Sequence, residues 1–366
     1  MKSSVPGIKT RHKEYTLLFP IAALVILIVW GSAAPLSFAL AVAINLLALA
    51  AILVSAFNVV RHADVLAHRL GEPFGSLILS LSVVILEVSL ISALMATGNA
   101  SPGLMRDTLF SVIMIVTTGL VGFSLLLGGR KFATQSVNLA GIKQYLMAII
   151  PLAVIVLVLP ASLPDGNFST AQALIAAAIS AAMYGVFLLI QTTTHQKWFI
   201  YEHEDGDDDD PHGKPSAHSS TWHSIWLILH LIAVVAVTKF NAVPLEQLLS
   251  DLNAPQQITG FLVALLILSP EGLGAIKAVL KNQVQRAMNL FFGSVLATIS
   301  LTVPTVTIIA ILTGHPLAFG LELPQVVVML TAMILCQISF STGRTNVLNG
   351  TAHLALFGAY LMTLML

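Results

Sequence analysis

Charge is scarce in this sequence. Only 9% of its 366 residues are charged, against roughly 25% in an ordinary soluble domain. The chain has one cysteine, Cys336, which excludes an intramolecular disulfide framework and a Cys-x-x-Cys metal site. The formal net charge is zero and no basic face stands out, so we do not expect nucleic acid as a partner.

Hydrophobic residues are in excess instead. They make up 57% of the chain, and the mean hydropathy is +0.90. One crossing of a bilayer core needs about 20 mostly apolar residues. The sequence therefore predicts an all-α polytopic membrane protein with eleven transmembrane helices, surrounded by the lipid bilayer. The predicted spans are 15–31, 36–60, 74–97, 108–128, 144–160, 169–191, 223–240, 257–279, 288–313, 324–341 and 349–366.

The distribution of Lys and Arg predicts the orientation. If the N-terminus is inside, 15 of the 17 basic residues fall on the cytoplasmic side, and only Arg106 and Lys239 fall on the other. Cytoplasmic loops carry such an excess. We therefore expect an inner (plasma) membrane protein with a cytoplasmic N-terminus and an outside C-terminus. Residues 31–35, GSAAP, resemble a signal-peptide cleavage site, but we favour a retained first helix because no extracellular domain follows.

One soluble segment interrupts the apolar pattern. Residues 202–210 hold seven of the 17 acidic residues, with histidines around them. Such a charge block cannot bury enough apolar surface to fold alone. We interpret residues 192–222 as an acidic, His-containing linker, and the charge count predicts that it is cytoplasmic. The predicted division of the chain is a tail with a peripheral first helix at 1–35, a first five-helix repeat at 36–191, the linker, and a second five-helix repeat at 223–366.

The two halves show internal similarity. The segments 75–92 and 259–276 each carry a glutamate at the thirteenth position, Glu87 and Glu271. A second copy of an odd number of spans must enter the membrane inverted, and inverted repeats are typical of secondary transporters. We therefore expect one peripheral helix followed by two inverted five-helix repeats.

Glu87 and Glu271 are also the only acids that fall near the middle of a predicted span. An ionised side chain at the bilayer centre costs roughly 2.5 to 3.5 kcal/mol on insertion scales. One alternative is structural, with each glutamate permanently protonated and hydrogen-bonded between helices. Because intramembrane acids usually mark ion pathways or proton relays, we interpret the pair as an ion-binding and proton-binding site.

The chemistry of a buried carboxyl pair suits exchange. Burial disfavours ionised carboxyls, and a cation between them reverses that preference, so cation and protons compete for the same oxygens. Candidate helpers are the hydroxyls of Ser80, Ser111, Ser294 and Thr298, although Ser and Thr also serve close helix packing.

The second glutamate has helix-disrupting neighbours. Pro270 removes one helical hydrogen bond directly before Glu271, and Gly272 loosens the next turn. We expect a helix break there, which would offer backbone oxygens to an ion.

Other function classes fit less well. An enzyme is not expected, because the sequence has neither an HExxH nor a GxSxG motif. A passive cation channel could use the same two acids. A membrane scaffold could instead sense cations through the acidic loop, and it would then not need the buried glutamates.

The chain resembles the cation/proton exchangers of the calcium/cation antiporter (CaCA/CAX) superfamily. Besides the two glutamates, the resemblance is carried by GEPFGSL (71–77), GFSLLLGG (122–129), FFGSVL (291–296) and STGRTNVLNG (341–350). It covers essentially everything after the first span. It implies a secondary active antiporter that exports Ca²⁺, Na⁺ or K⁺ in exchange for H⁺, has no cofactor, and binds the metal ion at Glu87 and Glu271.

The chain departs from the family pattern at positions that could supply ligands. The family has Gly-Asn shortly before each glutamate, whereas this chain has Val83 and Val84 in one repeat and Ile267 and Leu268 in the other. Two amide oxygens are therefore missing. Because Ca²⁺ prefers six to eight oxygen ligands, we expect a site that accepts Na⁺ or K⁺ more readily than a Ca²⁺-selective one.

Overall fold

The computed structural model describes residues 15–31, 36–70, 74–95, 101–199 and 218–365. The acidic block at 202–210 lies outside the described residues, as do the side chains of residues 67, 68, 70 and 74–80.

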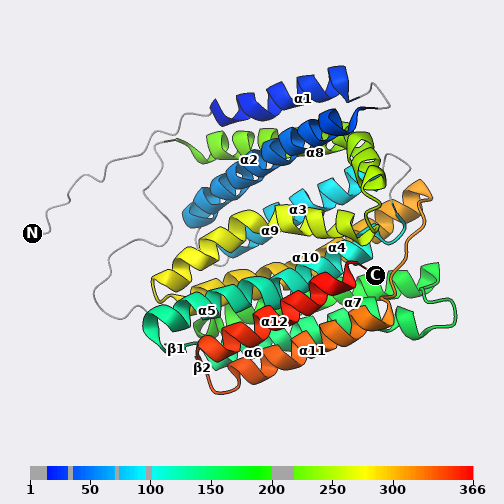
Figure 1. The fold of residues 1–366 in the computed structure, drawn as a ribbon. Coiled ribbons are helices and arrows are strands. Elements are labelled where there is room, and N and C mark those ends of the chain that lie inside the picture. The colour runs from blue at the N-terminus through cyan, green and yellow to red at the C-terminus, as the bar shows by residue number, and fades with distance from the viewer. Residues whose placement is uncertain (1–14, 32–35, 71–73, 96–100, 200–217, 366) are drawn as a thin grey trace, which may run out of the picture.

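The described chain is helical almost throughout (Figure 1). Its helices are α1 (Leu18–Trp30), α2 (Phe38–Leu70), α3 (Phe74–Met95), α4 (Leu104–Met114), α5 (Val121–Phe132), α6 (Leu139–Ala153), α7 (Thr170–Leu189), α8 (Ser220–Asp251), α9 (Gln257–Leu280), α10 (Val284–Thr313), α11 (Leu323–Phe340) and α12 (Val347–Thr363). A π-helical turn, Ile115–Leu120, joins α4 and α5 into one continuous rod. Two short strands, β1 (Gln135–Ser136) and β2 (Arg344–Thr345), pair antiparallel.

Helix length and composition define a polytopic membrane protein. Among the described residues, eight helical segments are long and apolar enough to cross a bilayer, and Tyr15–Trp30 and Leu81–Met95 are shorter apolar helices. Large apolar side chains such as Leu46, Ile175 and Ile232 point away from the protein interior. Exposed apolar surface of this extent suits contact with lipid rather than water.

Each of the eleven predicted spans overlaps a helix, although the bounds differ. The largest differences are in α2 and α8, which continue to Leu70 and to Asp251, well past the predicted ends at residues 60 and 240. Hydropathy finds only the part of a helix that matches the hydrocarbon, whereas helical hydrogen bonding continues through the polar residues that follow. The count of eleven crossings stays a prediction.

The long helices α2 and α8 form the most extensive pair in the structure, and α1 packs on both of them (Figure 1). Buried Ala23 and Leu27 are part of the contact surface of α1. A polar contact lies within the apolar α2–α8 interface: Asn241 Nδ2 donates to Asn45 Oδ1 at 3.0 Å. Asn45 Nδ2 in turn donates to the carbonyl of Pro244 at 3.0 Å, so the amide nitrogens of both residues have partners.

Helix α10 lies at the centre of the remaining helices. It packs against α3, α6, α7 and α9, while α4 packs against α9, and α12 packs against α5 and α11. Phe291, Phe292 and Val295 on α10 are almost completely buried. Side chains on α10 can therefore reach both α3 and α9, the helices that carry the two intramembrane acids.

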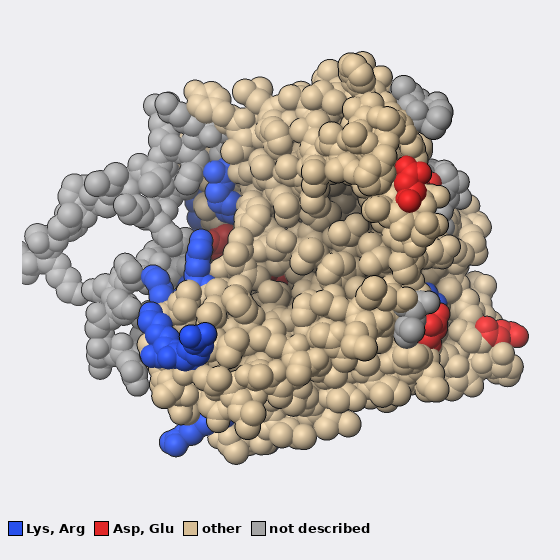
Figure 2. Space-filling view, viewed as in Figure 1, with Lys and Arg blue, Asp and Glu red and all other residues tan. Residues whose placement is uncertain are grey.

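The two ends of the helices differ in charge. Figure 2 shows Lys and Arg gathered at the end where β1 and β2 lie in Figure 1, and most of the visible Asp and Glu at the opposite end. We call these the basic end and the acidic end.

Helices α4 and α9 approach so closely at Gly260 that a larger side chain there should destabilise the protein. A Cβ added to Gly260 would lie 2.7 Å from the Asp107 carbonyl carbon and 2.8 Å from the Thr108 nitrogen, and both of these are backbone atoms that cannot rotate away. We expect Gly260→Ala to destabilise the protein by about 1–3 kcal/mol through overpacking, measured as a lower Tm of the purified protein in detergent. Gly274→Ala on the same helix is the control, because its Cβ meets nothing within 4 Å. Equal Tm values for the two variants would contradict this packing.

Candidate ion-binding site

Glu87 lies in α3 and has 0% of its surface exposed. The hydroxyl of Thr298 on α10 donates a 2.7 Å hydrogen bond to Glu87 Oε2. Its other oxygen, Oε1, is buried and has no hydrogen-bond partner. A buried acceptor without a partner typically costs about 1–3 kcal/mol, so this carboxyl favours any proton or cation that can satisfy it.

Glu271 lies in α9 and is 8% exposed. Ser294 of α10 lies next to its carboxyl and Thr302 of α10 lies next to that of Glu87, but neither hydroxyl makes a hydrogen bond there. Glu271 Oε2 is also buried without a partner. The two carboxyls are close enough to interact electrostatically.

One face of α10 joins the two acids. Ser294, Thr298 and Thr302 are spaced four residues apart, so they form a single stripe along the helix. All three are buried. We call these three residues with Glu87 and Glu271 the carboxyl–hydroxyl site. It offers acceptor oxygens from three helices in a buried part of the protein.

The predicted helpers divide into two groups. Ser294 and Thr298 lie at the two glutamates, as described above. The Ser111 hydroxyl instead donates to the Asp107 carbonyl at 2.6 Å and accepts from Tyr360 at 2.9 Å. One of these bonds is local and the other comes from α12, and a role of Ser111 in ion binding stays a prediction. Ser80 lies in α3, but its side chain is outside the described part of the structure.

The expected helix break at Pro270 and Gly272 is wrong. Helix α9 runs without interruption from Gln257 to Leu280, with Pro270 inside it. Proline removes only one N–H donor, and close packing of the turn holds the helix together: a Cβ on Gly272 would lie 3.1 Å from the Leu120 side chain. Glycine at this position lets the π-helical turn approach the helix next to Glu271.

That π-helical turn is a feature the sequence did not predict. Its Thr117 carbonyl accepts a 2.6 Å hydrogen bond from Nδ1 of His353 on α12, and His353 Nε2 lies 3.0 Å from the Ser339 hydroxyl on α11. Because a carbonyl oxygen only accepts, Nδ1 carries a proton. Single π-helical turns often occur at functional sites. Here His353 ties α11 and α12 to the turn that packs beside Glu271.

The sequence analysis also did not predict a cluster of three histidines between α2 and α8. His62 of α2 and His223 and His230 of α8 are all buried, and Nδ1 of His62 lies 2.8 Å from Nδ1 of His223. His62 is far from the other two in the sequence, so spacing alone does not reveal the contact. The repeat of seven between His223 and His230 was the available signal, because it places both on one helix face.

Resident metal centres usually have three or more protein ligands. In the part of the chain that the structure describes, no three His, Cys, Asp or Glu side chains converge in a metal-holding arrangement. Glu87 and Glu271 supply two carboxylates, so an ion there would share its shell with hydroxyls.

A carboxyl pair buried between helices of a polytopic membrane fold is typical of ion-transport proteins. The chain belongs to the sodium/calcium exchanger protein family, whose model matches residues 40–193 and 222–366. It is a transporter of cations, and the resemblance to the calcium/cation antiporter superfamily is confirmed.

Individual relatives agree with this family. The chain is 74% identical over 366 residues to the sodium-potassium/proton antiporter ChaA of Escherichia coli (strain K12), covering 100% of both chains. It is 36% identical over 314 residues to the putative ionic transporter y4hA of Sinorhizobium fredii (strain NBRC 101917 / NGR234), covering 84% of each. Among solved structures, native YfkE has the same fold, with a TM-score of 0.72 at 18% identity, covering 96% of this chain and 99% of that one.

The His353 contact generates a stability prediction. His353→Leu leaves the buried Thr117 carbonyl and Ser339 hydroxyl without this partner, which we expect to cost about 1–3 kcal/mol and to lower the Tm in detergent. His353→Asn keeps an N–H donor close to the position of Nδ1, so it should recover a large part of that loss. If Asn and Leu lower the Tm equally, the bond to Thr117 does not stabilise the π-helical turn.

Proposed function

We propose that this chain is a secondary active antiporter of an inner membrane that exports Na⁺, K⁺ or Ca²⁺ from the cytoplasm in exchange for protons. The observation that carries the proposal is the carboxyl–hydroxyl site: two buried glutamates on different helices, each with an oxygen that has no hydrogen-bond partner. A site of this kind stays occupied either by protons or by a cation. Exchange follows from the competition between them.

The exchange step can be written in terms of the site residues. A cation from the cytoplasm binds between Glu87 and Glu271 as their protonated carboxyls ionise and release protons to that side. After the site opens outward, the cation leaves and protons from outside return to the same oxygens. Thr298 donates to Glu87, so its O–H stabilises the ionised carboxyl when the proton has gone.

The choice of ion follows from the residues around each glutamate. Val83, Val84, Ile267 and Leu268 occupy the places where the family pattern has Gly-Asn, and all four are buried. Apolar side chains there supply no ligand oxygen, and Ca²⁺ prefers six to eight. The name of the 74% identical relative, a sodium-potassium/proton antiporter, agrees with an alkali cation as the main cargo.

The architecture proposed for this activity is one peripheral helix and two inverted five-helix repeats, giving eleven crossings, with repeats at 36–191 and 223–366. The family model supports this division, because its two matched blocks leave out residues 194–221. The separation of basic and acidic ends supports an orientation with the basic end in the cytoplasm. The partners are then inorganic cations, protons and lipid.

The first experiment measures proton flux in everted membrane vesicles that hold an inside-acid pH gradient. We expect K⁺ or Na⁺ to dissipate the gradient with the native chain and Ca²⁺ to do so less effectively. Glu87→Gln and Glu271→Gln should each abolish the response, because a neutral amide cannot exchange a proton for a cation. Asp165→Asn, an exposed acid outside the site, is the control. Exchange that survives in both glutamine variants would disprove the proposed site.

The Thr298 hydroxyl gives a graded prediction. Thr298→Val keeps the side-chain shape and removes the donor to Glu87, and a hydrogen bond to a charged group contributes about 1.5–3 kcal/mol. We expect the apparent KM for the cation to rise about ten-fold or more, since about 1.4 kcal/mol corresponds to a factor of ten. Thr298→Ser should restore it. Thr305→Val is the control, because that exposed hydroxyl only bonds the Leu301 carbonyl of its own helix. An unchanged KM in Thr298→Val would show that this hydroxyl has no part in ion binding.

A further inference from the structure

The π-helical turn Ile115–Leu120 contacts both His353 of α12 and the part of α9 that carries Glu271. Leu120 ends the turn, and a Cβ added to Gly272 would meet its side chain at 3.1 Å. Gly272 directly follows Glu271 in the chain. Because a π-turn holds one residue more than an α-turn, it decides which side chains of the rod face α9. The conformation of this turn therefore decides what packs beside Glu271.

His353 is held firmly against the turn. Its ring is buried, Nδ1 donates to the Thr117 carbonyl at 2.6 Å, and Nε2 lies 3.0 Å from the Ser339 hydroxyl of α11. A Cβ added to Gly122, two residues after the turn, would lie 2.9 Å from the His353 Cβ, so α5 and α12 are in close contact there. Both ring nitrogens have partners, and the close helices leave the ring little space to rotate.

The turn also has hydrogen bonds of its own. The hydroxyls of Thr117 and Thr118 donate to the carbonyls four residues earlier on the same rod. Threonine makes such bonds in ordinary α-helices as well, so they do not favour a π-turn over an α-turn. From other helices, the Thr117 carbonyl receives the N–H of His353 and, at 3.9 Å, the weak S–H donor of Cys336. His353 makes the stronger of these two contacts with the backbone of the turn.

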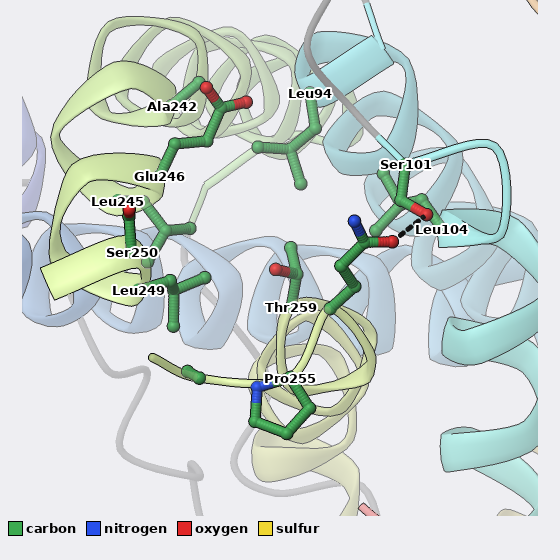
Figure 3. A pocket seen from close by; sticks show the side chains of 12 residues that line it. Leu94, Ser101, Leu104, Ala242, Leu245, Glu246, Leu249, Ser250, Pro255 and Thr259 are labelled. Carbon is green, nitrogen blue, oxygen red and sulfur yellow. Dashed lines mark hydrogen bonds between the residues drawn. The ribbon is translucent and has the colours of Figure 1, made fainter. Parts of the chain in front are cut away.

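Helix α9 is not closely packed along its whole length. Its N-terminal end borders a cavity of about 320 Å³ between α4 and α8, and Figure 3 shows Pro255 and Thr259 on the wall. Empty space beside a helix removes packing contacts that would otherwise hold it. The contact of Leu120 with Gly272 lies about 20 Å further along the helix from Thr259, and it limits how far α9 can shift at Glu271.

The geometry points to His353 as a positioning residue for ion selectivity, which acts on Glu271 through the π-helical turn and Leu120. This inference rests on the proposed function, and it assigns to the antiporter a residue that affects the bound ion without touching it. Na⁺ and K⁺ differ in radius, and discrimination between them depends on the spacing and number of the ligand oxygens. A turn that loosens lets α9 shift, which changes this spacing and with it the relative affinity for the two ions.

Two amide substitutions separate the two bonds of the ring. The amide nitrogen of Asn lies near the position of Nδ1 and that of Gln near the position of Nε2. His353→Asn therefore keeps the bond to Thr117, whereas His353→Gln keeps only the contact with Ser339. The apparent KM values for Na⁺ and K⁺ are measured by proton flux in everted vesicles at matched protein levels.

We expect His353→Gln to change the ratio of the two KM values about three-fold or more, as is usual for residues that modulate a distant site. His353→Asn and Ser339→Ala should keep the ratio close to that of the native chain, because both leave the Thr117 bond in place. A purely structural role would lower the Tm and the amount of active protein without changing the ratio. Exchange itself persists in all three variants, because Glu87 and Glu271 are intact.

The path through Leu120 gives a double-variant test. Leu120→Ala removes the side chain that meets α9 and should change the KM ratio as well. Combined with His353→Gln, it should add little, because residues on one path are coupled rather than additive. Leu157→Ala is the control: this buried leucine lies in the segment Val154–Val158, which packs on α6, and its loss should leave the ratio unchanged. A native ratio in His353→Gln, or full additivity with Leu120→Ala, would overturn the inference and leave the antiporter standing.

Hydrogen–deuterium exchange of the purified protein tests the same path without transport. His353→Gln should increase deuterium uptake in the turn and in residues 268–276 of α9, and His353→Asn should not, because local opening follows the loss of the contacts that hold a segment. Equal uptake in the two variants would refute the path from His353 to α9. Absence of cation/proton exchange in the native chain would instead refute the proposed function, and with it the role in selectivity.

Discussion

The structure depends on a constraint of solvation: two carboxyl groups are buried among apolar helices, Glu87 completely and Glu271 with 8% of its surface exposed. Glu87 and Glu271 can be accommodated there only if their oxygens find partners, and the protein supplies some of these from α10 and leaves others open. A fully satisfied pair would be a rigid structural element with nothing to exchange. In the proposed exchange, the oxygens left without partners are the ones that protons and cations occupy in turn.

The partners that the protein does supply to the two carboxyls come from the hydroxyl stripe of α10. Ser294, Thr298 and Thr302 bring neutral oxygens to both acids without adding a further charge to desolvate. Around them the helix is packed with buried aromatic and aliphatic side chains, including Phe291 and Val295. The stripe therefore has little freedom to move relative to α3 and α9, and changes of ion occupancy act on a fixed set of oxygens.

The sequence predicted the acids and two of their partners, and it failed where contacts depend on the tertiary fold. Glu87 and Glu271 stand out in the sequence because placing an acid inside an apolar span costs free energy. Helix packing gains nothing from such an acid, so its presence indicates a function. Ser111, Ser294 and Thr298 belong to similar hydroxyl patterns in the sequence. The bond that Tyr360 of α12 donates to Ser111 depends on how α12 packs against α4, which these patterns do not record. The contact of His62 with His223 and the π-helical turn at Thr117 depend on neighbours from distant parts of the chain, which no local spacing records. The continuity of α9 through Pro270 likewise depends on the helices packed around it.

The α2–α8 pair has a consequence for motion. Near one end the two helices are joined by Asn45 and Asn241, and further along by His62 and His223. Two polar contacts so far apart along one apolar interface fix the register, since sliding one helix past the other breaks both at once inside a dry environment. Together with α1, which packs on both helices, the α2–α8 pair is therefore one rigid unit. If the protein opens alternately to the two membrane faces, as the proposed function requires, these three helices have to move together.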